Sequence, residues 1–144
     1  MEAFLVDVSP RVPFKHTGSP LDDLRTQMIA FVRLLRGPHG RWIAGLIAEG
    51  VLDEEVNEAL RTRWLVHRRA EGLRVVRRAI ELGELPPHTD PELALDALYG
   101  PIYFRLMLGH RPIDARFAVS VWTSVTRGLR CEPAAGAKPR RARA

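Results

Sequence analysis

The side chains that carry most catalytic and metal chemistry are scattered along this sequence. The five histidines fall mostly at predicted loops, and only His67 and Glu71, four residues apart on one helix face, have a spacing that suits a metal ion. With no second pair nearby, this spacing is more typical of an ordinary surface contact. The sequence shows neither a nucleophile elbow nor a glycine-rich phosphate loop, and Cys131 is more typical of a bystander than of a nucleophile. We therefore expect no enzymatic activity, no cofactor and no metal.

Aromatic and methionine residues in the predicted helices suit a different kind of chemistry, the binding of an apolar molecule. Such side chains line ligand cavities, although they fill cores more often, and their spacing alone leaves both roles open. Tyr99 and Tyr103 lie one helical turn apart beside Pro101 and would offer hydroxyl groups to a mostly apolar ligand. The candidate ligand-binding residues are Met28, Phe31, Trp42, Trp64, Tyr99, Tyr103 and Met107.

The length and composition indicate one globular domain. The chain has 144 residues, of which 46% are hydrophobic and 27% are charged. No apolar run approaches the roughly 18 residues that a transmembrane helix needs. The N-terminus lacks the basic start and the apolar run of a signal peptide, and a single cysteine cannot form an internal disulfide. We therefore expect a cytoplasmic protein without a membrane partner.

The positive charge of the chain is concentrated near its C-terminus. Of the net charge of +5, the stretch from Arg130 to Ala144 carries +4, so the rest is close to neutral. This stretch is rich in alanine, proline and arginine and has too little apolar surface to pack. It favours a solubilising tail, with a weak contact to nucleic acid as the alternative. We divide the chain into an N-terminal extension (1–20), a folded domain (21–130) and a disordered basic tail (131–144).

The spacing of apolar residues predicts an all-α domain of five helices, at about 21–36, 40–49, 53–82, 91–108 and 114–130. Asp53, Asp90 and Asp114 are expected to cap the last three helices, and Gly50 is expected to end the second. Pro101 should kink the fourth. The outer face of the third helix is expected to be charged, with Arg61, Arg63, Arg68, Arg69, Arg74, Arg77 and Arg78.

The helix predicted at 91–108 is apolar on nearly every side, so it must be buried on more than one face. In a single chain, part of this surface would stay exposed as a large apolar patch. The final helix adds a line of small residues, Ser120, Ser124 and Gly128, which lets another helix approach closely. We therefore expect a homodimer in which two helices from each chain form a four-helix bundle. The expected interface residues are Leu95, Leu98, Ile102, Phe104, Phe117, Val121 and Val125.

Three stretches of this sequence, in this order, resemble the C-terminal domain of TetR-family transcriptional regulators. The stretch from Lys15 to Leu24 is similar to the Thr-Gly-Ser and Asp-Leu start of that domain's first helix. The stretch from Asp90 to Arg105 resembles the family's penultimate helix, with its Gly-Pro and aromatic-Arg signature. The stretch from Gly109 to Phe117 resembles its last loop and helix. The resemblance covers about residues 15–130.

The resemblance implies a helical domain that encloses an apolar effector cavity and dimerises through its last two helices. In the family, a helix-turn-helix domain precedes this segment, whereas only about fifteen residues precede it here. The stretch from Ile43 to Asp53 looks superficially like a helix-turn-helix, but the supposed reading helix would open with three carboxylates, at Asp53, Glu54 and Glu55. We reject it and expect DNA binding only through a helix-turn-helix domain missing from this chain.

The leading hypothesis is thus a TetR-like ligand-binding and dimerisation domain that senses a small apolar or amphipathic effector. Two alternatives remain. The first is a stand-alone dimeric protein that sequesters a small molecule or forms heterodimers with full-length relatives. The second is the product of a truncated or mis-started regulator gene. Inspection of the coding sequence upstream of Met1 for an in-frame helix-turn-helix would separate the leading hypothesis from the stand-alone alternative.

Overall fold

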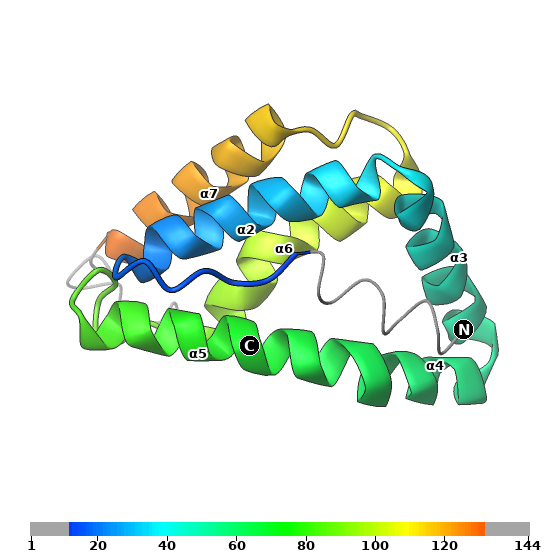
Figure 1. Ribbon diagram of the computed structural model, residues 1–144, viewed down its shortest axis with the longest axis horizontal. Helices are drawn as coiled ribbons and strands as arrows, with labels where there is room; N and C mark the ends of the chain where they lie inside the picture. The colour runs from blue at the N-terminus through cyan, green and yellow to red at the C-terminus, as the bar shows by residue number, and fades with distance from the viewer. Residues whose placement is uncertain (1–11, 132–144) are drawn as a thin grey trace, which may run out of the picture.

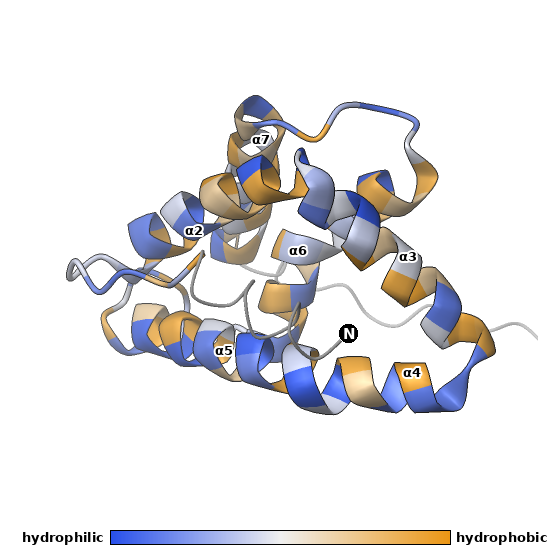
Figure 2. Ribbon diagram, turned by 45° about the vertical axis from the view of Figure 1, so that its right-hand side comes forward, coloured by the Kyte–Doolittle hydropathy of each residue, from blue (hydrophilic) through white to orange (hydrophobic). Residues whose placement is uncertain are grey.

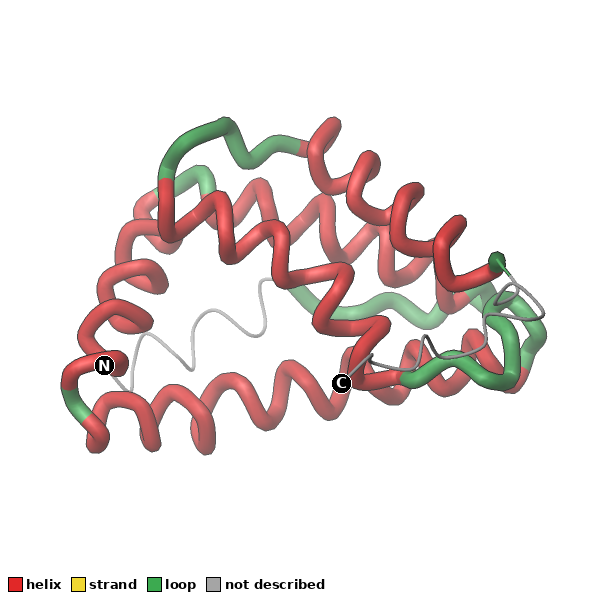
Figure 3. Tube along the Cα trace, turned by 180° about the vertical axis from the view of Figure 1, so that it is seen from behind, coloured by secondary structure: helices red, strands yellow, loops and turns green. Residues whose placement is uncertain are grey.

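Helix α2 (Pro20–Leu35) lies at the centre of the computed structural model, which describes residues 12–131 (Figure 1). Its apolar residues recur every three or four positions, and Leu24, Met28 and Phe31 are buried. α2 contacts every other long helix, so it organises the core. All regular structure within residues 12–131 is helical (Figure 3), which confirms the predicted all-α class.

Helix α3 (Pro38–Leu52) is longer than the predicted 40–49. Pro38 occupies its first turn, where a missing N–H costs nothing. The prediction that Gly50 ends this helix is wrong. Gly50 is buried and helical, because it packs against Asn57 and Leu60 of the next helix, and the chain becomes extended only at Asp53.

The third predicted helix is a continuous run that contains a π-helical turn. It consists of α4 (Glu54–Leu60), η2 (Arg61–Leu65) and α5 (Val66–Glu81). Asp53 caps it as predicted, since its carboxylate accepts hydrogen bonds from the N–H groups of Glu55 and Val56. A π turn holds about one residue more than an α turn, so it rotates the helix faces that follow relative to those before it. Figure 2 shows polar and apolar residues alternating along α5.

Helices α6 (Pro91–Leu108) and α7 (Ala115–Arg130) complete the domain. Both predicted caps are confirmed: Asp90 accepts from the backbone of Glu92 and Leu93, and Asp114 from that of Phe117. α6 continues as a helix through Pro101. α5 and α6 approach closely at Gly72, where an added Cβ would lie 2.7 Å from a methyl group of Leu95.

Four of the seven predicted interface residues belong to the core of the single chain. Leu95, Leu98, Ile102 and Val121 are buried without any partner, so the expectation that they form an exposed dimer surface needs correction. The physical reason is that α6 packs on both α5 and α7. These two contacts bury more of the apolar surface of α6 than its sequence pattern predicts. Phe104 remains 59% exposed, and Phe117 and Val125 are partly buried.

The folded unit begins earlier than the predicted boundary at residue 21. Val12 is buried in the core and Phe14 packs against it, so residues 12–19 belong to the domain. The predicted basic tail lies outside the described residues from residue 132 onward. Within residues 12–131, no helix is long and apolar enough to cross a membrane, and no group of three potential metal ligands comes together.

Candidate ligand-binding site

A cavity of about 260 Å³ lies where α2, α5 and α6 meet the segment that precedes α2. Both tyrosines of the sequence line it, one turn apart on α6. Its wall is mostly apolar and aromatic, with a few polar groups, which is the usual character of a small-molecule site. We call this space the tyrosine cavity. Its lining residues are Phe14, Phe31, Leu65, Arg68, Arg69, Leu95, Asp96, Tyr99, Gly100 and Tyr103.

Phe31 holds the two tyrosine rings from the side of α2. Its ring centroid lies 6.0 Å from that of Tyr99 and 5.8 Å from that of Tyr103, both with the rings inclined. Burial raises the pKa of both phenols, although the positive charge of Arg68 opposes this effect. The hydroxyl groups therefore stay neutral at physiological pH, where each can donate and accept a hydrogen bond.

Two residues of the tyrosine cavity are connected to the same backbone carbonyl, that of Val12. Arg68 donates directly from Nη1 to this oxygen, over 3.0 Å. The Tyr99 hydroxyl donates to Oε1 of Gln27, and Nε2 of Gln27 donates to the Val12 carbonyl over 3.3 Å. A change at either cavity residue therefore reaches the segment before α2 through hydrogen bonds.

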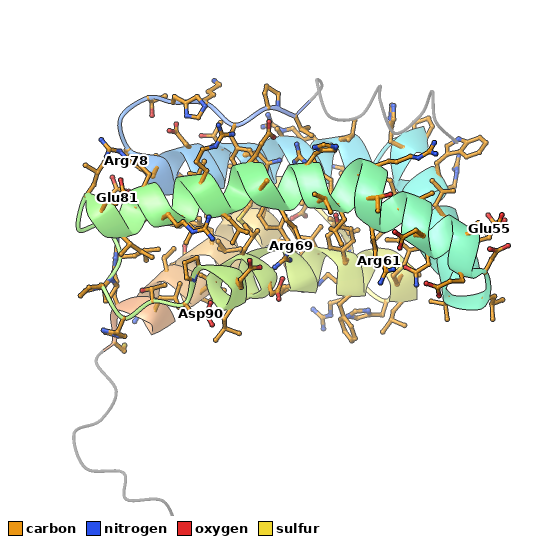
Figure 4. The ribbon with its side chains drawn as sticks, turned by 90° about the horizontal axis from the view of Figure 1, so that it is seen from below. Glu55, Arg61, Arg69, Arg78, Glu81 and Asp90 are labelled. Carbon is orange, nitrogen blue, oxygen red and sulfur yellow. The ribbon has the colours of Figure 1, made fainter. Side chains whose placement is uncertain are left out.

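Arg69 and Asp96 face one another across the edge of the tyrosine cavity. The guanidinium of Arg69 binds Asp96 through Nη1 and Glu92 through Nη2, and these contacts raise its pKa. Figure 4 shows Arg69 on the side of α5 that faces α6. The three side chains thus join the two helices and neutralise the one carboxylate in the cavity lining.

A second cavity, of about 350 Å³, lies on the other side of Tyr103 and Leu65, which line both spaces. We call it the tryptophan cavity. The ring of Trp64 stands edge-on to Tyr103, with centroids 6.3 Å apart. The indole Nε1 of Trp64 is buried and has no hydrogen-bond partner within residues 12–131, which is unusual for a buried donor. The other lining residues are Ile47, Gly50, Val51, Asn57, Leu60, Arg61 and Met107.

The structure brings five of the seven predicted ligand-binding residues to these cavities. Phe31, Tyr99 and Tyr103 line the first, and Trp64 and Met107, together with Tyr103, line the second. Met28 is instead fully buried in the core, because its position on α2 faces the middle of the bundle. Trp42 lies on α3 with 63% of its surface exposed and lines neither cavity.

The sequence pattern missed Phe14, Leu65, Arg68 and Arg69. Phe14 lies in the segment predicted to be an N-terminal extension, and the two arginines lie on the face predicted to be charged and outward. The π turn just before them changes which face of α5 they occupy, and both are only partly exposed. The expected outward face is counted on the period of a regular α-helix, and this period does not include the rotation that the π turn causes.

Comparisons with known proteins agree with the fold and with the sequence motifs. Residues 14–125 match the family model described as "Tetracyclin repressor-like, C-terminal domain". The chain is 31% identical over 134 residues to the "Uncharacterized HTH-type transcriptional regulator YdeS" of Bacillus subtilis (strain 168), covering 93% of this chain and 68% of that protein.

The structure is similar to the crystal structure of the TetR family transcription regulator SCO0332, with a TM-score of 0.84 and 30% identity, covering 91% of this chain and 72% of that one. Both of these relatives are named as transcriptional regulators. The chain therefore belongs to the TetR family of transcriptional regulators and matches the family's C-terminal domain over most of its length.

Proposed function

We propose that this chain is a dimeric effector-binding domain, and that a small apolar or amphipathic molecule occupies the tyrosine cavity. The observation that carries the proposal is the lining of this cavity. Aromatic and aliphatic side chains form most of its wall, and the two tyrosines, Arg68 and the Arg69–Asp96 pair supply polar groups. The adjoining tryptophan cavity gives room for a longer ligand, and a polar atom there would satisfy the Trp64 indole N–H.

The effector signal leaves the cavity through the carbonyl of Val12. A ligand that binds Arg68 or Tyr99 competes with the hydrogen bonds that these side chains make toward Val12. It thereby changes the position of the segment before α2. The name of YdeS indicates a helix-turn-helix domain in that protein. We propose that DNA binding by the present protein would likewise require such a domain.

The dimer surface in this proposal is the outward stripe of α6 together with the small residues of α7. Leu93, Phe104 and Leu108 lie on one face of α6 at spacings of eleven and four, and each is about 60% exposed. Ser120, Ser124 and Gly128 are exposed at four-residue spacing on α7. A two-fold axis beside these helices would cover both surfaces in one self-complementary interface.

A pair of neighbouring substitutions tests whether the tyrosine cavity is the ligand site. Leu65 and Val66 are both partly exposed apolar residues at the junction of η2 and α5, but only Leu65 lines the cavities. The neutral dye N-phenyl-1-naphthylamine, whose emission rises in apolar surroundings, is the probe. We expect wild type to bind one dye per chain saturably.

We expect Leu65→Trp to weaken this binding about tenfold or more, since overfilling a packed site costs about 1–3 kcal/mol. Val66→Trp should bind the dye as wild type does. Equal weakening in both variants, or no saturable binding by wild type, would contradict the proposal. Melting temperatures of the two variants, measured alongside, distinguish loss of the site from loss of the fold.

A further inference from the structure

Arg68 differs from the other charged residues of the tyrosine cavity. Arg69 and Asp96 form an ion pair that Glu92 completes. For Arg68, no carboxylate of residues 12–131 lies within 4 Å of the guanidinium. The three charged residues of the lining sum to +1, and Glu92, which binds Arg69 from outside the lining, brings the group of four to zero. Of the two arginines, Arg68 is the one without a carboxylate partner among residues 12–131.

Aromatic rings hold the guanidinium of Arg68 in place. Its central carbon lies 5.6 Å from the ring centroid of Phe14 and 5.9 Å from that of Phe31. A guanidinium has five N–H donors, and within the described residues only Nη1 is used, for the carbonyl of Val12. The side chain is thus oriented by stacking while most of its donors stay available.

Arg68 and the two tyrosines surround the same ring: the centroid of Phe31 lies 5.9 Å from the central guanidinium carbon of Arg68, 5.8 Å from the ring centroid of Tyr103 and 6.0 Å from that of Tyr99. The positive charge of Arg68 counters, for each phenol, the rise in pKa that burial causes. The Tyr103 hydroxyl makes no hydrogen bond to any residue of 12–131, so it remains a free donor. Arginine and neutral phenols together form a donor set that suits an anion with two acceptor oxygens.

We propose that the effector is an amphipathic carboxylate whose acid group binds Arg68 and the Tyr103 hydroxyl, and whose apolar body packs against Phe14, Phe31 and Leu95. A monoanion would pair with the guanidinium of Arg68, which no carboxylate of residues 12–131 contacts, and the partly buried site strengthens this attraction relative to water. A ligand cation would meet the same charge unfavourably. This inference rests on the proposed function, because it names the chemical class of ligand for the same cavity.

Isothermal titration with an isosteric pair, 2-naphthoate and the neutral 2-naphthamide, tests the proposed charge preference at pH 7.5. We expect wild type to bind naphthoate about tenfold to a hundredfold more tightly, the usual effect of hydrogen bonds to a charged group. Arg68→Gln should lose this preference while its affinity for naphthamide stays within about threefold of wild type. Arg74→Gln, at an exposed position of α5 outside the cavity lining, should keep the full preference.

Arg68→Lys provides a second variant that retains the charge without the planar fork, and it should show an intermediate preference. If Arg68→Gln does not fold, the preference of Arg68→Lys for naphthoate over naphthamide tests the proposal by itself. Three results would overturn the carboxylate proposal and leave the proposed function standing. Wild type could bind the two compounds equally, or it could bind neither of them while still binding the neutral dye. The full preference for naphthoate could also survive in both Arg68 variants. Failure of both the naphthalene compounds and the dye would overturn both.

Discussion

Replacing Gly40 by alanine is expected to lower the free energy of unfolding by about 3 kcal/mol or more, which is near the upper end for single substitutions. An added Cβ would lie 1.9 Å from the carbonyl oxygen of Leu35 and 2.8 Å from its carbonyl carbon. Leu35 and Ile43 are buried on either side of this corner, so the backbone has little room to relax. Urea denaturation followed by circular dichroism measures the change.

Gly45→Ala is the matched control for this prediction. It lies on the same helix, and nothing is within 4 Å of its added Cβ. Alanine has the higher helix propensity, so this variant should gain about 0.5–1 kcal/mol. Both variants must be compared at one protein concentration, because the proposed dimerisation would contribute to apparent stability. Similar stability of the two variants would show that the contact between α2 and α3 is looser than the structure indicates.

Replacing Phe104 by glutamate is expected to convert a dimer into monomers. Phe104 lies in the middle of the proposed α6 stripe, and a carboxylate there would be stranded in an apolar interface at a cost of about 3–5 kcal/mol. This cost raises the dissociation constant more than a hundredfold. Sedimentation at a protein concentration on the order of 10 µM should give wild type twice the monomer mass of 16.2 kDa and the variant the monomer mass.

Leu52→Glu is the control for the dimer prediction. Leu52 is apolar and 90% exposed, but it stands at the end of α3 and does not belong to the proposed α6 and α7 surface. The Leu52→Glu variant should therefore leave the proposed dimer intact. Val121→Glu is less informative, since Val121 is buried in the single chain and its replacement is expected to unfold the protein. Wild type that sediments as a monomer, or a Phe104→Glu variant that remains dimeric, would rule out this surface.

The helices and their caps were predictable because their causes are local. An aspartate that accepts hydrogen bonds from the N–H groups two and three residues later acts within its own turn, and Asp53 and Asp90 do so as predicted. The end of α3 was not predictable in this way. Gly50 stays helical because of its contact with Leu60, and a pattern along the sequence does not show such a contact.

The site was predictable only in part, for reasons of geometry. Tyr99 and Tyr103 share a helix face with a spacing that the α-helical period predicts correctly. Arg68 follows a π turn, which changes its face, and Phe14 comes from a segment without periodicity. For α6, an apolar pattern on all sides does not distinguish residues that pack within the chain from residues at an interface. The pattern therefore predicts Leu98 and Ile102 at the interface, whereas both are buried in the core of the single chain.

The most direct test of the effector site uses the two tyrosines of the sequence, because both line the tyrosine cavity. Protein labelled with 3-fluorotyrosine gives two fluorine resonances, one from Tyr99 and one from Tyr103. We expect titration with N-phenyl-1-naphthylamine to shift both resonances until one dye is bound per chain, and Leu65→Trp to suppress the shifts. Saturable binding of the dye that leaves both resonances unchanged would contradict the claim that this cavity binds the effector.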